Sequence, residues 1–169
     1  MDEAMDEGMD TPKNGPHETF KEAMEALEGS LNTLHAKIVR VAERHYALVE
    51  AQEKSVTEWK DKGILRLGTH RKGNHVQVKW YTIKWFGKGA ARREVKASIR
   101  KSAKEDTFSM AHLKENAKEW EWPIIENTEL EMALLRKQAS FVVKAMTSLR
   151  YASMAARKYD DLYSEPGDE

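Results

Sequence analysis

Apolar residues recur at alternating spacings of four and three along the first third of the chain, which predicts a long helix, in one piece or broken near Gly29 and Ser30. The positions are Leu27, Leu31, Leu34, Ile38, Val41, His45, Leu48, Gln52, Ser55 and Trp59. Such a heptad seam needs a second helix to cover it. We predict a helix over residues 17–62, ended by Gly63 in a left-handed conformation. The polar His45 and Gln52 on the seam are expected to fix the register or the oligomeric state of the helices rather than to bind a metal.

The spacing of apolar residues then changes to a period of two, which predicts β-strands. We expect strands over residues 64–68, 75–86 and 92–101, with turns at 69–74 and 87–91. Short connections make consecutive strands neighbours, so the three strands form an antiparallel meander. The alternation in the middle strand slips between Trp80 and Tyr81, and we expect a β-bulge there.

Two further helices are predicted after the strands. A short helix over residues 107–121, begun by Thr107 or Ser109, is expected to cover one face of the sheet as a lid, because three strands cannot bury a face alone. A last helix over residues 123–163 repeats the heptad spacing at Thr128, Met132, Leu135, Ala139, Val142, Met146, Leu149, Ser153 and Ala156. This second seam complements the first. The two long helices can pack within one chain, join two chains into a homodimer, or do both.

The predicted fold class is α+β: a small three-stranded antiparallel sheet with a lid helix, flanked by two long heptad-patterned helices. Residues 63–122 form the predicted DNA-binding unit between the helices. Residues 1–16 and 164–169 are acidic and contain glycine and proline, which predicts two disordered tails. The tails are expected to keep the protein in solution. A sharper alternative is that an acidic tail imitates DNA and competes for basic residues.

Composition narrows the class of protein. The chain has no cysteine, which excludes disulfides, thiolate nucleophiles and zinc sites built on cysteine. No segment approaches the roughly 18 apolar residues that a membrane span needs. The acidic first residues also differ from a secretory signal, which is basic and then apolar. We therefore expect a cytoplasmic protein with no membrane partner.

Charge is strongly segregated along the chain although the formal net charge is zero. Residues 60–104 carry fourteen lysines and arginines but only two acidic residues, whereas residues 160–169 carry five acids and no base. An approaching partner responds to such a block and not to the total charge. A basic block of this density favours an anionic partner.

Strand alternation indicates where these basic residues lie. One face is expected to carry Arg66, Lys79, Tyr81, Arg93, Lys96, Ser98 and Arg100, and the turns add His70, Arg71, Lys72, Lys88 and Arg92. The opposite face is expected to carry Val76, Val78, Trp80, Val95, Ala97 and Ile99. Lys84 and Trp85 follow the predicted bulge, so their face stays open. With Lys84 and Lys101, these basic residues and Tyr81 form the candidate DNA-binding set.

A basic face backed by an apolar face is typical of a sheet that enters a DNA groove. Lysine and arginine neutralise phosphates and release counterions, and two or three strands fit the major groove. The simpler interpretation is that charge protects an edge of the sheet from aggregation, but the basic residues extend into both turns. RNA is an alternative, because Trp80, Tyr81, Trp85 and Phe86 could stack on unpaired bases. A module that inhibits a host protein by binding an acidic surface is another.

No combination of residues predicts catalysis. The six histidines form no paired ligand motif of the HExxH kind, and the glycine cluster of residues 87–91 lacks the spacing of a phosphate-binding loop. A nucleophile needs a neighbouring base, and a nicking tyrosine would need a histidine cluster for its metal. We predict a protein that is not an enzyme and that has no cofactor, no metal and no small-molecule substrate.

The segment VQVKWYTIKWFGKGAARREVKASIRK is followed by Phe108-Ser109, Trp120-Glu121, Thr128-Glu129 and Arg136. This series resembles the MobI family of accessory mobilisation proteins from conjugative plasmids and integrative conjugative elements, over about residues 64–150. The resemblance implies binding to DNA at the origin of transfer and help in assembling the relaxase there. The order of strands and helix also resembles small DNA-binding domains, such as those of integrase arms, that read the major groove with three strands.

Overall fold

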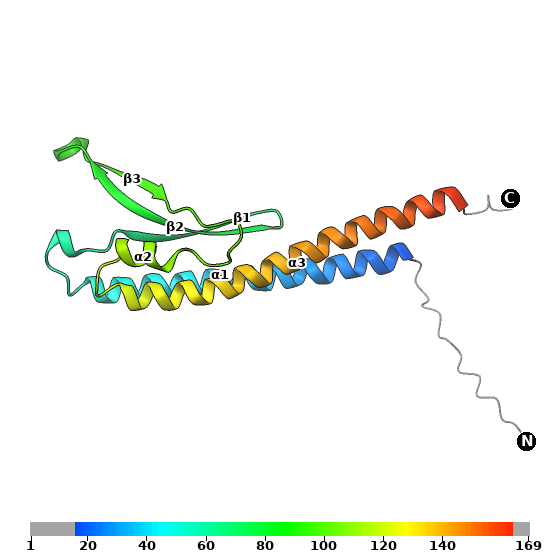
Figure 1. The fold of residues 1–169 in the computed structure, drawn as a ribbon, viewed down its shortest axis with the longest axis horizontal. Coiled ribbons are helices and arrows are strands. Elements are labelled where there is room, and N and C mark those ends of the chain that lie inside the picture. Colours follow the sequence, from blue (N-terminus) through cyan, green and yellow to red (C-terminus); the bar gives the residue numbers. More distant parts are fainter. Residues whose placement is uncertain (1–15, 164–169) are drawn as a thin grey trace, which may run out of the picture.

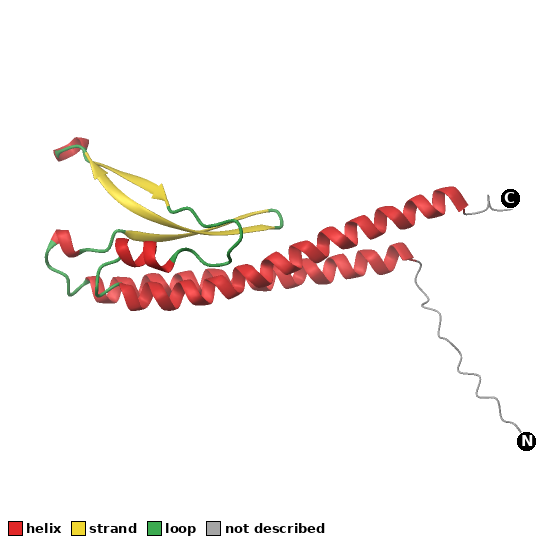
Figure 2. Cartoon of the chain, in the orientation of Figure 1, coloured by secondary structure: helices red, strands yellow, loops and turns green. Residues whose placement is uncertain are grey.

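The computed structural model describes residues 16–163, which form two long helices that carry a three-stranded sheet (Figures 1 and 2). The elements are α1 (Pro16–Glu53), η1 (Trp59–Asp61), β1 (Leu65–Lys72), β2 (His75–Phe86), η2 (Gly89–Ala91), β3 (Arg93–Ser98), α2 (Met110–Asn116) and α3 (Trp122–Tyr163). The α+β fold class is confirmed. The predicted acidic tails lie outside the described residues, apart from Pro16, which begins α1.

Helices α1 and α3 pack antiparallel along their length within one chain (Figure 1). Three cross-helix pairs show their direction. His17 bonds to Asp160 at 2.8 Å, Arg44 bonds to Glu131, and the imidazole of His45 bonds to the hydroxyl of Thr128 at 3.0 Å. Each seam is therefore covered by the other helix of the same chain, and the homodimer stays a prediction.

The buried positions of the two helices follow the predicted seams closely. On α1 they include Leu31, Leu34, Ile38, Val41 and His45, and on α3 they include Thr128, Met132, Leu135, Ala139 and Met146. The prediction is wrong at Leu48, which is 47% exposed, while Val49 is 7% exposed. An α-helix has 3.6 residues per turn, so a strict repeat of 3.5 drifts off the contact line.

Helix α1 ends at Glu53, nine residues before the predicted end at residue 62. Because His45 lies opposite Thr128, the last turn of α1 lies opposite the start of α3 at Trp122. Beyond that point no helix covers the seam, so residues 54–62 form a turn and η1 instead. The left-handed Gly63 was also wrong, since the glycines with positive φ are Gly73, Gly87 and Gly89.

Gly63 is required by a close approach. A Cβ atom at this position would lie 2.5 Å from Oε1 of Glu121, which is fully buried. Hydrogen is therefore the only side chain that fits without a shift of the carboxylate.

The strands have the order β1-β2-β3 and are antiparallel throughout. Lys72 pairs with His75 across the two-residue turn Gly73-Asn74, and the register then continues without a break to Leu65 and Thr82. Tyr81 pairs with Ser98 in an equally continuous register with β3. The expected bulge between Trp80 and Tyr81 is therefore absent, and the two side chains lie on opposite faces.

The long helices carry the sheet. Strand β1 packs on α1 and β2 packs on α3, while α2 packs beside α3. Trp80 and Leu65 are almost fully buried between sheet and helices, and α2 adds Leu113 to the same core. A short helix is present as predicted, and Ser109, one of the two expected starts, caps it by accepting from the His112 amide at 3.3 Å. The helix ends at Asn116, five residues before the predicted residue 121. Its expected role as the main cover of the sheet is wrong.

Strand β3 has no helix against either face. Every one of its residues is exposed, including Val95 and Ala97, which were expected to face a lid. Figure 1 shows β3 and the adjoining end of β2 rising away from the helices. Ile99, just after β3, is 7% exposed, so the chain returns to the core there.

Candidate nucleic-acid interface

The register divides the sheet into two faces, because directly opposed residues project to the same side. The face opposite the buried core, called the outer face, consists of Arg66, Gly68, His70, Lys72, His75, Gln77, Lys79, Tyr81, Ile83, Trp85, Glu94, Lys96 and Ser98. These residues are exposed or half-buried apart from Ile83, which is 7% exposed. The inner face carries the buried Leu65, Leu67, Val78 and Trp80.

Four candidate residues share the outer face as predicted: Arg66, Lys79, Tyr81 and Lys96. Arg93 was wrongly placed there. It pairs with Phe86, and so lies on the same side as Val95 and Ala97. Arg100 is exposed but follows the end of β3, so strand alternation no longer fixes its direction.

The remaining candidates lie around the rim of the sheet. Lys72 is exposed at the tip of the β1–β2 hairpin, where Arg71 donates from Nε to the Gly73 carbonyl at 3.0 Å. Lys88 and Arg92 flank η2 at the other end of the sheet. Lys84 is exposed and shares the side of Trp80, beyond the reach of the helices.

The cations of the outer face are poorly neutralised. Glu94 is the one acidic residue in the three strands, and its carboxylate lies 3.7 Å from the Lys96 ammonium. Lys72 and Lys79 are exposed and form no ion pair with any described residue. An incoming anion could therefore contact these ammonium groups without displacing a protein partner.

Tyr81 is held across the middle of the outer face. A Cβ atom on Gly68 would lie 2.7 Å from Cε2 of Tyr81, so the ring covers the glycine directly. The glycine opens the space that the ring occupies. A flat aromatic surface therefore lies among Arg66, Lys79 and Lys96.

An aromatic and cationic cluster lies at the end of the sheet near η1. The guanidinium carbon of Arg92 is 4.9 Å from the ring centroids of both Trp59 and Trp85. The two tryptophans are in edge contact at 5.9 Å and are 57% and 43% exposed. This cation–π contact fixes the β2–β3 connection against η1 while leaving both rings partly open to solvent.

Arg66 differs from the other cations of the outer face because its side chain bonds to the backbone of the same chain. Its guanidinium donates to the carbonyls of Gly63 at 3.1 Å and Leu65 at 2.9 Å, and the side chain is partly buried. These two bonds to backbone carbonyls occupy part of the guanidinium, so fewer N–H donors remain for a ligand.

The inner side contains a buried charged network that the sequence pattern did not assign. Glu129 is fully buried and accepts from the Trp80 indole at 2.8 Å and from the Phe108 amide at 2.8 Å. Arg136 completes the network with an ion pair to Glu129, and its Nε donates to the Asp106 carbonyl at 2.9 Å. The available signal was that Glu129 and Arg136 lie seven residues apart and each directly follows a seam position, Thr128 and Leu135.

His45 is buried beside this network. Thr128 gives its only hydroxyl hydrogen to the Ile124 carbonyl at 2.7 Å, so the 3.0 Å contact must be a bond donated by His45 Nδ1. Burial and, to a smaller extent, the charge of Arg66 together lower the pKa of His45 to about 4. A neutral His45 thus links α1 to α3, which agrees with the register role predicted from the sequence.

Glu121 is buried at the start of α3 with an incomplete set of partners. Its Oε2 accepts from the Lys118 amide at 3.3 Å, whereas Oε1 has no hydrogen-bond partner among residues 16–163. Burial raises the pKa of Glu121 to about 7, against the lowering effects of the Lys118 amide and Arg66. This carboxyl group is therefore partly protonated near neutral pH.

The described part of the chain offers no cluster of three or more histidine, cysteine, aspartate or glutamate side chains that could hold a metal ion. No described helix is both long enough and apolar enough to cross a bilayer. The side chains that stand out on the sheet are the cations and aromatic rings of the outer face.

An exposed basic sheet on a helical hairpin defines a candidate binding module, and one comparison places it more closely. The family model described as MobI protein matches residues 34–150, which are 117 of the 169 residues. The chain belongs to the MobI family, and this membership implies a role in plasmid mobilisation. The match includes all three strands, α2 and most of α3. No curated protein and no solved structure matches the chain.

Proposed function

We propose that the protein is an accessory DNA-binding protein of conjugative transfer. It binds duplex DNA at the origin of transfer through the outer face and helps the relaxase to assemble there. Membership of the MobI family supports the setting, since it implies plasmid mobilisation. The proposal adds the ligand, the face that binds it and the partner enzyme.

One observation carries the DNA part of the proposal. Lys72, Lys79 and Lys96 are exposed on one face of a twisted sheet that has a single acidic residue. Ammonium groups spread over three strands match the spread of phosphates along a groove, and each contact releases counterions. Antiparallel strands are narrow enough for the major groove of duplex DNA.

The experiment is a fluorescence anisotropy titration of a labelled duplex with the full chain at several salt concentrations. Binding is compared between a transfer-origin fragment and a scrambled duplex. We expect tighter binding to the origin fragment, and a preference that persists as salt rises, because base contacts are less sensitive to salt than phosphate contacts.

The variant is the triple Lys72→Ala, Lys79→Ala, Lys96→Ala. Loss of three phosphate contacts should flatten the plot of log affinity against log salt by roughly 2–3 in slope. Thermal unfolding should stay unchanged, because these side chains are exposed and Lys96 is the only one with an ion-pair partner.

The matched control removes three exposed helical lysines, Lys21, Lys37 and Lys158. It has the same net charge as the first variant but leaves the outer face intact, so its affinity for DNA should stay near that of the wild type. Equal losses in both variants would mean that net charge, and not the outer face, drives binding. Competition by duplex RNA or single strands would reassign the ligand.

A further inference from the structure

The first half of β2 has a neighbouring strand on one side only. β1 pairs with His75–Thr82, but the register with β3 begins at Tyr81. One further bond, from the Ile99 amide to the Trp80 carbonyl at 2.8 Å, ends the contact on that side. Residues 75–79 therefore form an open edge inside an otherwise paired sheet.

The hydrogen-bond pattern shows which backbone groups this edge presents. The Ile83 amide bonds to the Ile64 carbonyl at 2.8 Å, which places the odd-numbered residues of β2 on the β1 ladder. Alternate residues of a strand bond to opposite sides. The amide and carbonyl groups of Val76 and Val78 therefore point outward from the open edge.

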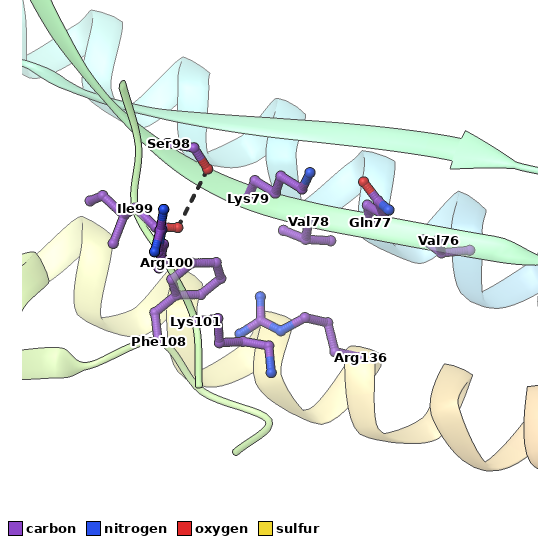
Figure 3. Close-up of a pocket in the computed structure, with 10 residues that line it drawn as sticks. All are labelled: Val76, Gln77, Val78, Lys79, Ser98, Ile99, Arg100, Lys101, Phe108 and Arg136. Carbon is purple, nitrogen blue, oxygen red and sulfur yellow. Dashed lines mark hydrogen bonds between the residues drawn. The ribbon is translucent and has the colours of Figure 1, made fainter. Parts of the chain in front are cut away.

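A cavity of about 410 Å³ lies along this edge, between β2 and α3 (Figure 3). Its walls combine four cations with apolar side chains, and no acidic residue lines it. They are Val76, Gln77, Val78, Lys79, Ser98, Ile99, Arg100, Lys101, Phe108 and Arg136. In Figure 3, Val76 and Val78 project from β2 toward α3, and the Arg136 guanidinium reaches from α3 into the space between them and Lys101.

Arg136 supplies a donor that the fold leaves unused. Its side chain is 10% exposed, and two of its nitrogens bind Glu129 and the Asp106 carbonyl. The third, Nη1, is buried and has no acceptor among the described residues. A buried donor without an acceptor is costly, so an acceptor that enters the cavity gains this energy on binding.

We propose that the open edge of β2 binds an extended, acidic segment of a partner protein. The segment adds a strand beside Val76 and Val78, and one of its carboxylates pairs with Arg136. Strand addition supplies both donors and acceptors for the exposed backbone groups. DNA phosphates only accept hydrogen bonds, so they leave the carbonyls of Val76 and Val78 unpaired.

Size and polarity agree with such a segment. Five residues of open edge span about 17 Å, which matches a peptide of five to seven residues. Apolar side chains two positions before and after the acidic residue share its face of the added strand and can contact Val76, Ile99 and Phe108. A second copy of the chain is a poor occupant, because pairing two open edges would bring Lys79, Arg100 and Lys101 of both copies together.

The test uses the ¹⁵N-labelled full chain and a capped heptapeptide that has glutamate at its centre, a valine two positions away on each side, and threonine at the other positions, so that the acidic and apolar side chains share one face. We expect saturable shifts at the amides of Val76 and Val78. The same peptide with glutamine in place of glutamate should bind at least about 10-fold more weakly, because a charge-assisted bond to Arg136 is lost.

Two N-methylated peptides separate strand addition from charge attraction. Methyl groups on alternate residues block one edge of the peptide, and methyl groups on the other residues block the opposite edge. One peptide should lose binding and the other should keep it. Equal binding of both would overturn strand addition, because charge alone does not distinguish the two edges.

Protein variants give an independent readout that does not disturb the Glu129 pair. Val76→Pro removes an amide that points out of the sheet, which an edge strand tolerates, and should abolish peptide binding. Val76→Ala is its control for the lost side chain. Peptide binding that survives Val76→Pro while Val76→Ala remains normal would refute the proposal.

The outcome is separable from DNA binding by the outer face. A double variant, Lys72→Ala with Lys96→Ala, should lose affinity for DNA and keep affinity for the peptide, since neither residue lines the cavity. If duplex DNA shifts the Val76 and Val78 amides and the acidic peptide does not, the cavity belongs to DNA and the peptide proposal is wrong.

Discussion

Charged side chains are paired on the inner side of the sheet and largely unpaired on its outer face. On the inner side, Glu129 is fully buried and bonded to Trp80, Phe108 and Arg136. On the outer face, Lys72 and Lys79 are exposed without an ion-pair partner among the described residues. A charge under the sheet is tolerated only when it is paired, whereas an unpaired cation in water costs little and stays available. Substitutions should therefore affect stability on one side and binding on the other.

The largest expected effect follows removal of the buried carboxylate. Glu129→Ala leaves Arg136 buried without its partner and the Trp80 indole without its acceptor. We expect a loss of about 3–5 kcal/mol in the free energy of unfolding, measured by urea denaturation. The matched substitution on the other face, Lys79→Ala, should change it by less than about 0.5 kcal/mol. Comparable losses would abolish the distinction between the faces.

A second prediction concerns Glu121, the buried carboxyl group that is not fully paired. Its pKa is raised from 4.5 to about 7, so a proton held in the folded state is lost from the unfolded chain between these values. Its contribution therefore favours folding below pH 4.5 and is lost as the pH rises through 7.

Glu121→Gln imitates the protonated group at every pH. Given the raised pKa, we expect the variant to be more stable than the wild type by about 1–3 kcal/mol at pH 8, with the difference vanishing near pH 4. Urea denaturation at both pH values measures this. The lowered pKa of His45 gives an opposite slope between about 4 and 6.5, but it is common to both proteins and cancels. A variant that is less stable at pH 8 would contradict the raised pKa of Glu121 and the lack of a partner for its Oε1.

The smallest expected effect tests the outer face by adding affinity. Glu94→Gln removes the only acidic residue of the strands. DNA affinity at about 0.1 M salt should rise a few-fold, and the salt dependence should steepen, because Lys96 is released from its 3.7 Å contact. Stability should not change, since this surface pair contributes little. Unchanged affinity in the anisotropy titration would place the DNA away from Lys96.

The strands and the helical pair were accessible from the sequence because each pattern reflects its own packing. β2 runs over residues 75–86 as predicted, but the first strand and turn were predicted wrongly: β1 extends to Lys72 through residues 69–72, and the turn is only Gly73-Asn74. The seam positions from Leu31 to His45 are buried as expected. The family resemblance was confirmed by the match over residues 34–150.

The wrong predictions arose where one sequence pattern is compatible with two different structures. The apparent slip at Trp80 and Tyr81 is not a bulge; the outer face also carries the large side chains of Tyr81, Ile83 and Trp85. Arg93 was grouped with Lys96 by its charge although strand alternation separates them. The heptad spacing of residues 55–59 continues past the point where α3 begins, and a helix without a partner ends there.

The sequence predicted only part of the candidate site. Exposed lysines can be assigned from alternation and charge, but the open edge of β2 depends on where β3 stops. The pairing of Glu129 with Trp80 and Arg136 joins residues up to 56 positions apart in sequence, and only the packing of α3 under the sheet brings them together.

The unequal lengths of sheet and helices have a consequence for motion. Buried side chains of the helical pair begin at Leu31 on α1 and end at Met146 on α3, while residues farther from the sheet are partly or fully exposed. The helical pair is thus held by buried side chains at the end near the sheet, and the His17–Asp160 contact is its last cross-helix contact at the other end. Local unfolding should begin at that far end of the pair. The rate of amide hydrogen exchange should therefore be highest there and should decrease along both helices toward the sheet.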